Sequence, residues 1–269
     1  MGFRINTNLS SLRARRALSG RTAELNRNFS RLGSGNRLSS DDASAVGRSS
    51  RLGAEARSLS TVVRNAQSGI DSAKRADGQL AEVNDNLSRL RELAVAGSNG
   101  VLSDVDREAL NAEFAALVDE IDRVATEDAG DEGITLDGGD AVEIQTGTNA
   151  GESVQSPEVD VTAKGLKLDS VDLSDPASAG AALETVHSAA DSVSKARSEL
   201  GNFSRTLSQR QSAAARSQQS HLSAEGRITS VDAAIEAAKL VQNQLLSHSS
   251  IASLLQANVG PGEALRLLG

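Results

Sequence analysis

The chain has 269 residues, with 36 acidic and 28 Lys or Arg side chains, four Phe, and no Trp, Tyr or Cys. Disulfides, thiolate metal sites and cysteine nucleophiles are therefore excluded, and the interior must be built from Leu, Val, Ile and Ala. Residues 1–60 hold eleven Arg and four acidic residues, whereas residues 100–185 hold 21 acidic and four basic residues. Nucleic-acid binding is disfavoured, because the arginines alternate with Leu at helical spacing and aromatic side chains that stack on bases are scarce.

The first predicted helix lies within residues 1–40. Its apolar residues recur every seven positions, with one Phe between them: Leu18, Leu25, Phe29 and Leu32. Residues at this spacing share one helix face, and an apolar face must be buried against something. Gly33, Ser34 and Gly35 then break the helix. A phosphate-binding loop is disfavoured here, because no strand precedes these residues and no Gly-Lys-Ser/Thr follows.

A very long helix is expected over residues 43–96, because no proline occurs before Pro157. Asp41 and Asp42 at its start are better explained as helix-capping residues than as a metal site or an acid–base pair. The helix carries a bundle seam in which large and small residues alternate. The large members of this seam include Leu80, Leu87 and Leu90.

A second, antiparallel helix is predicted after a short turn at residues 97–100. Ser103 and Asp106 form a capping box at its start. Its apolar face comprises Leu110, Phe114, Leu117, Ile121 and Val124.

Residues 133–172 have a different texture, with alternating apolar and polar residues between glycine-rich turns. The segment 141–146 predicts a strand, and residues 159–161 are its expected partner in a small β-hairpin element. Helical periodicity resumes at Leu183. Its seam includes Val193, Leu200 and Leu207.

Gly226 is expected to separate this helix from a terminal one. The terminal helix carries a second stripe with a seven-residue repeat, together with an additional Ile near its start: Val231, Ile235, Ala238, Leu245 and Ala252. Neither end holds enough sequence for a core of its own. Each apolar face must therefore pack against the other terminus or against a neighbouring molecule, which is typical of a chain that polymerises.

Sites of chemistry are not indicated. The three histidines, His187, His221 and His248, are far apart and lack the spacing of zinc ligands. A nucleophile elbow of the form Gly-x-Ser-x-Gly is missing from the sequence. Met1 is not followed by the apolar run of a signal peptide, and no stretch reaches the roughly 18 apolar residues of a membrane helix. We expect a structural protein without enzymatic activity, cofactor, metal or membrane insertion.

At the level of motifs the chain resembles bacterial flagellins, in a short form. The resemblance runs from end to end, with motifs in the family's order. They are Ile5 to Asn8, Arg31 to Gly35, Ser40 to Ala43, Asn65 to Ile70, Leu90 to Val95, Glu120 to Val124, Ser230 to Glu236, Gln256 to Asn258 and Pro261 to Leu268.

The resemblance implies a mainly α fold: a long antiparallel helical bundle or coiled coil with a small β-hairpin element, and with paired N- and C-terminal helices. Residues 1–40 and 226–269 would form the inner terminal-helix domain. Residues 41–225 would form a helical rod with its hairpin region at 133–172. The chain would polymerise into the flagellar filament for swimming motility.

The resemblance further implies secretion by the flagellar type III apparatus, with an export chaperone, and an extracellular location in the filament. Hook-associated junction and cap proteins would be its other partners. Arg89, Leu93 and Glu113 match the family positions that contact the flagellin-sensing Toll-like receptor of vertebrates. The simpler interpretation is that this surface packs against the next subunit along the filament. Leu93 is expected to lie outside the intramolecular core.

Two alternatives stay open at this point. The first is the hook–filament junction protein, a relative with the same paired terminal helices. The second is a secreted coiled-coil adhesin or signalling ligand, which would stay monomeric at high concentration.

Overall fold

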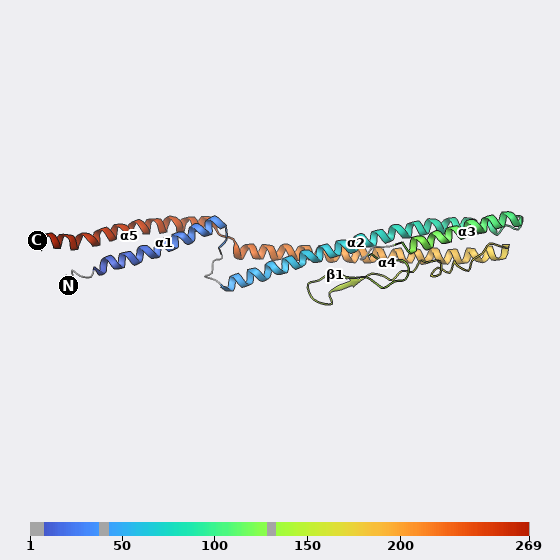
Figure 1. Ribbon diagram of the computed structural model, residues 1–269, viewed down its shortest axis with the longest axis horizontal. Helices are drawn as coiled ribbons and strands as arrows, with labels where there is room; N and C mark the ends of the chain where they lie inside the picture. The colour runs from blue at the N-terminus through green and yellow to red at the C-terminus, as the bar shows by residue number, and fades with distance from the viewer. Residues whose placement is uncertain (1–7, 38–42, 128–132, 269) are drawn as a thin grey trace. The chain divides into compact units, whose positions relative to one another are not determined.

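The computed structural model describes residues 8–37, 43–127 and 133–268, with side chains as far as residue 259. Its elements are α1 (Leu9–Ser34), α2 (Ala43–Gly97), α3 (Asp104–Ala125), β1 (Glu143–Gln145), β2 (Ser153–Gln155), α4 (Pro176–Thr229) and α5 (Ala233–Leu268) (Figure 1). The predicted fold class is confirmed: the protein is mainly α-helical, with one small antiparallel hairpin and a pair formed by its terminal helices.

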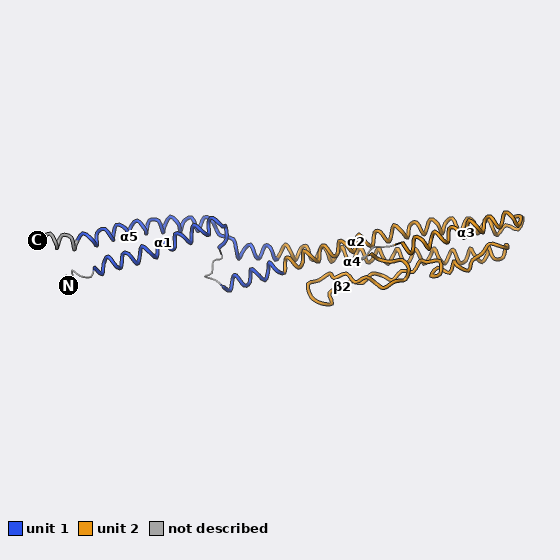
Figure 2. Tube along the Cα trace, viewed as in Figure 1, with its two compact units in different colours: residues 1–54, 221–269 blue, residues 55–220 orange. Residues whose placement is uncertain are grey.

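The chain divides into two compact units (Figure 2). The terminal unit comprises residues 1–54 and 221–269, and the rod unit comprises residues 55–220. Both limits fall inside helices, since α2 and α4 each run from one unit into the other. The sequence placed the corresponding limits at residues 40–41 and 225–226, close to the breaks between helices.

The rod unit has a continuous apolar core. Its seam residues from α2, α3 and α4 come together there: Leu80, Leu87, Leu90, Ile121, Val193, Leu200 and Leu207 are almost fully buried, and Leu117 is half-buried against them. Alanines between these large residues let the helices approach closely. The seven-residue spacing in the sequence therefore corresponds to one buried helix face.

The helix starts of the rod unit are capped by short polar side chains. The Ser103 hydroxyl accepts a hydrogen bond from the Asp106 N–H at 3.2 Å, as the capping box predicts. At the start of α4, Asp175 accepts from the N–H groups of Ala177 and Ser178. Pro176 occupies the first helical position, where a missing N–H is tolerated. The helix therefore begins seven residues before Leu183, where apolar periodicity first becomes visible in the sequence.

The hairpin has a different partner strand from the one expected. β1 pairs with β2, in the register Ile144 opposite Val154. Residues 159–161 bond instead to the segment around Leu136, where the Val161 N–H donates to the Leu136 carbonyl at 2.9 Å. The physical reason is the turn before β2, where Gly151 adopts φ 83° and brings the chain straight back.

Gly69 of α2 lies where this hairpin packs against the helices. A Cβ atom there would lie 2.8 Å from Leu207 Cδ1 and 3.1 Å from Ile144 Cγ1. The bare backbone therefore lets β1 approach the surface that α2 and α4 form together.

Of the two helix breaks predicted near the terminal helices, the one at the N-terminal side is present and the one at Gly226 is not. Gly35 ends α1 in the left-handed conformation, with φ 65°. Gly226, however, does not end a helix: α4 continues to Thr229, and the break lies at residues 230–232. A helix tolerates an interior Gly at a cost of about 1 kcal/mol, whereas the Asp232 carboxylate caps a new helix by accepting from the Ala234 and Ile235 N–H groups. Asp41 and Asp42 lie outside the described residues.

Candidate assembly surface on the terminal helices

The two terminal helices pair antiparallel within the terminal unit (Figure 1). At one end, the Asn8 amide donates to the Ala257 carbonyl at 2.8 Å while its oxygen caps α1. At the other end, Arg31 lies 3.5 Å from Glu236. These contacts fix one register along the full pair.

The buried side chains of this pair are polar. Ser11 and Asn28 are the buried residues of α1, and Glu236 is buried on α5. Of the predicted apolar stripe on α1, Leu18, Leu25 and Leu32 are half-buried, whereas Phe29 is exposed. The helix pair is therefore held by a mixed seam and not by an apolar core.

A cluster of four side chains from the two helices, Asn28, Arg31, Glu236 and Asn243, forms the centre of this seam and is called here the polar cluster. In the amide orientation that satisfies its neighbours, Asn28 donates to Glu236 Oε1 at 3.2 Å and accepts from Asn243 at 3.2 Å. Arg31 approaches the same carboxylate oxygen of Glu236, and Lys239 lies 3.5 Å from the other. Asn28 is 2% exposed and Glu236 5%, so the carboxylate is enclosed but compensated by charge and hydrogen bonds.

Sequence reasoning missed this polar cluster because it followed the apolar repeat. The buried or half-buried face of α5 carries its own seven-residue repeat, namely Glu236, Asn243, Ser250 and Ala257. On α1, Asn28 lies three residues after Leu25 and four before Leu32, which is the spacing of a coiled-coil seam. A search for periodicity in polar residues between apolar neighbours would have found both.

The predicted apolar stripe of α5 faces away from α1. Val231 is half-buried, but Ile235, Ala238, Leu245 and Ala252 are exposed. A helix in a two-helix pair can bury only one face, and here it is the face that carries Glu236 and Asn243 together with the half-buried Leu240, Leu246 and Leu254. Among the side chains described as far as residue 259, the pair leaves nine large apolar ones exposed, namely Leu9, Leu12, Phe29, Ile235, Val241, Leu245, Ile251, Leu255 and Val259.

In the rod unit, the expected contact surface around Arg89 is only partly present. Arg89 forms an ion pair with Glu113 at 2.7 Å and with Glu92 at 2.8 Å, and hydrogen bonds to Glu113 raise its pKa. Leu93, by contrast, is 3% exposed and belongs to the core, so the expectation that the core does not need it is wrong. It lies three residues after Leu90, on the same buried helix face.

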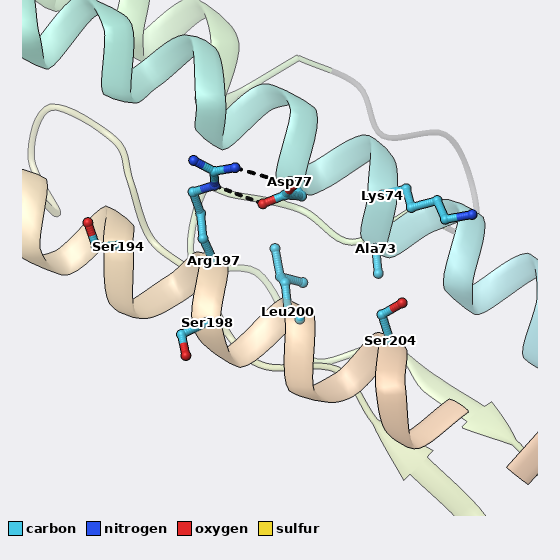
Figure 3. Close-up of a pocket in the computed structure, with 9 residues that line it drawn as sticks. Ala73, Lys74, Asp77, Ser194, Arg197, Ser198, Leu200 and Ser204 are labelled. Carbon is cyan, nitrogen blue, oxygen red and sulfur yellow. Dashed lines mark hydrogen bonds and ion pairs between the residues drawn. The ribbon is translucent and has the colours of Figure 1, made fainter. Parts of the chain in front are cut away.

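The groove between α2 and α4 offers little for chemistry (Figure 3). The Arg197 guanidinium donates to Asp77 at 2.8 Å, and this contact raises the pKa of Arg197. The remainder is lined by Lys74, three serine hydroxyls, Ala73, Leu200 and Gly201. Within the described ranges, no three His, Asp or Glu side chains gather as metal ligands would. Over the same ranges, none of the helices combines the length and apolar character of a membrane span.

Comparisons with known proteins agree with this architecture. Residues 5–139 match the bacterial flagellin N-terminal helical region, and residues 183–268 match the bacterial flagellin C-terminal helical region. A flagellin of Halalkalibacterium halodurans is 34% identical, over 98% of this chain and 99% of its own. The flagellar filament 30.7 kDa core protein of Treponema maltophilum is 30% identical, over 98% of this chain and 99% of its own.

Solved structures give the same result for the fold. The crystal structure of Bacillus cereus flagellin superposes with a TM-score of 0.51 at 25% identity, covering 56% of this chain and 88% of that one. A putative flagellar hook-associated protein from Vibrio parahaemolyticus shares the fold at 18% identity, with a TM-score of 0.60 over 70% of this chain and 99% of that one. Family models that match both halves and relatives that span the whole chain lead to one conclusion: the chain belongs to the bacterial flagellin family, a family of structural proteins and not of enzymes.

Proposed function

We propose that this protein polymerises into the flagellar filament, and that the exposed apolar face of the α1–α5 pair is its main assembly surface. The observation that carries the proposal is the set of nine large apolar side chains that the described part of the terminal pair leaves in solvent. Burying one such side chain in a contact between subunits would stabilise that contact by about 1.5–3 kcal/mol. Neighbouring copies that cover this surface would therefore supply the free energy that the mixed seam between the two helices lacks.

The relatives that span the whole chain favour this function over the alternatives. They include a flagellin and a filament core protein, each matched over 98% of this chain. The likeness to the hook-associated protein, at 18% identity, concerns the fold alone. A junction protein and a monomeric adhesin are therefore both disfavoured.

The experiment that tests the function is seeded polymerisation, followed by electron microscopy of the purified chain. Leu245→Asn and Leu255→Asn replace exposed apolar side chains of α5 and should reduce filament yield without lowering helix content. Gln244→Asn, at an exposed polar neighbour, is the matched control and should assemble normally. Normal filaments from both leucine variants would place the assembly surface elsewhere.

The inner filament domain is proposed to comprise residues 1–40 and 226–269, with residues 41–225 as the rod. Export through the flagellar type III apparatus, with a dedicated chaperone, would deliver the chain to the growing extracellular filament. Cap and hook-associated junction proteins would meet it there. Support for these partners comes from the family to which the chain belongs. Affinity capture on the purified chain, with and without α5, would identify a chaperone that binds the terminal helix.

Recognition by the flagellin-sensing Toll-like receptor is proposed for the surface formed by Arg89 and Glu113. Both side chains are about half exposed and form a charge pair, which is a plausible anchor for an interface. Leu93 would not take part directly, because it is buried. In a reporter-cell assay, Arg89→Ala should weaken activation several-fold relative to the intact monomer. A silent intact monomer would rule the proposal out.

A further inference from the structure

We propose that the polar cluster selects α1 as the partner of α5 and fixes the register in which the two helices pair. This inference rests on the proposed function and deepens it, because the register determines where the exposed apolar residues stand for neighbouring copies. It makes Asn28 and Glu236 positioning residues for assembly.

The first argument is that the polar cluster is satisfied in one register only. A slip of seven residues would separate Asn28 from Glu236 by about 10 Å along the helix axis. In one direction it would bring Glu24 to the place of Arg31, so that two carboxylates would meet. In the other direction it would run past the end of α1 at Ser34. A buried carboxylate without its partners is strongly unfavourable, whereas half-buried leucines accept a slip at little cost.

The second argument concerns the choice of partner. From Leu9 to Ser34, α1 has six Arg and one acidic residue. Two copies of α1 would therefore repel each other along their length. Between Ala233 and Val259, α5 offers Lys239 as its single Lys or Arg. Two copies of α5 paired over this range would bury Glu236 without an arginine. The charges thus favour the α1–α5 pair over both like pairs, which matters where many copies meet at high local concentration.

The absence of Cys from the chain allows a direct test of register by disulfide cross-linking. The pair Asn8→Cys with Ala257→Cys reports the observed register, since these residues are in contact. The pair Asn8→Cys with Ser250→Cys reports a slip of seven residues. In the otherwise unchanged full chain, the first pair should cross-link and the second should do so several-fold more slowly.

Asn28→Leu combined with Glu236→Leu makes the seam apolar, and circular dichroism checks that the helices remain. In that background the slipped pair should cross-link nearly as fast as the in-register pair. If the slipped pair stays slow there, the flanking residues set the register and the inference is wrong.

A charge exchange separates positioning from mere stability. Arg31→Glu should slow in-register cross-linking and lower filament yield, and Arg31→Glu with Glu236→Lys should recover both. A single variant that behaves like the unchanged chain, or a folded double variant without recovery, would overturn the inference. Failure of the unchanged chain to polymerise would refute the proposed function instead. The cross-linking rates would still show whether the polar cluster sets the register of the α1–α5 pair.

Discussion

The two units of this protein use the same helical repeat in opposite ways. In the rod unit, seven-residue repeats such as Leu80 and Leu87 face inward and form a closed apolar core. In the terminal unit, the apolar repeat that includes Leu245 faces outward, and a polar repeat that includes Glu236 faces the partner helix. The spacing is the same, but the chemistry of the inward face differs.

This difference shows how one chain can combine a unit with its own core, the rod unit, with a unit that exposes apolar side chains for assembly, the terminal unit. The rod unit buries its apolar residues within itself, in a core built from α2, α3, α4 and the segment between α3 and α4. The terminal pair has a mixed seam, and the polar groups buried in it add specificity but little free energy, since they mainly compensate for their own desolvation. Under the proposed function, the outward apolar face of the terminal unit would gain its stabilisation from other copies.

The largest effect is expected from removing one of the terminal helices, which carry the proposed assembly surface. Deletion of residues 226–269, or of residues 1–40, should abolish filaments and leave the rod unit folded, because its core lies within residues 55–220. Electron microscopy and circular dichroism measure the two outcomes. Loss of rod-unit helicity on deletion would mean that the units do not have separate sources of stability.

The next largest effect should come from opening the rod core. Leu87→Ala and Leu200→Ala each remove a side chain that is 1% exposed and should lower the free energy of unfolding by about 2–5 kcal/mol. Leu255→Ala, at an exposed position, should change it by less than about 0.5 kcal/mol while still reducing assembly. Denaturant unfolding of monomers, compared with filament yield, measures both. Equal destabilisation by all three would erase the distinction between inward and outward repeats.

A smaller effect is expected where a rod helix begins. Ser103→Ala removes the cap of α3 and should cost about 1 kcal/mol of rod stability. The control is Ser208→Ala, at an exposed site within α4. Because the rod core is proposed to be independent of assembly, filament yield should be unchanged. A loss of filaments with Ser103→Ala would link this helix start to polymerisation.

The smallest effect concerns acid. Hydrogen bonds from Ser178 and Ala177 lower the pKa of Asp175 below its usual value, and bonds from Ser174 lower that of Asp172. A depressed folded-state pKa contributes stability that is present above the unfolded value of about 3.9 and is lost as the pH falls through the folded value. Rod stability should therefore decline below about pH 4. Asp175→Asn should make this decline shallower in thermal melts taken between neutral and acidic pH.

Much of this molecule follows from sequence alone. The limits of α2, the capping box of α3, and the left-handed Gly35 after α1 are local features, so the residues that cause them adjoin the structure they produce. The rod seam was visible for a related reason: three apolar helix faces can bury one another in only a few ways. The candidate assembly surface was predicted in part, since the apolar stripes on both terminal helices indicated a chain that polymerises.

Tertiary structure alone decided which face of α5 is buried. The apolar stripe of α5 and its polar repeat are both periodic, and only the contact with α1 through Asn28 and Arg31 determines which of them is buried. Leu93 is a second example: the sequence left it outside the core, and the structure buries it in the core of the rod unit. Periodicity determines which side chains share one face of a helix. Which face is buried depends on the residues that the rest of the chain places against it.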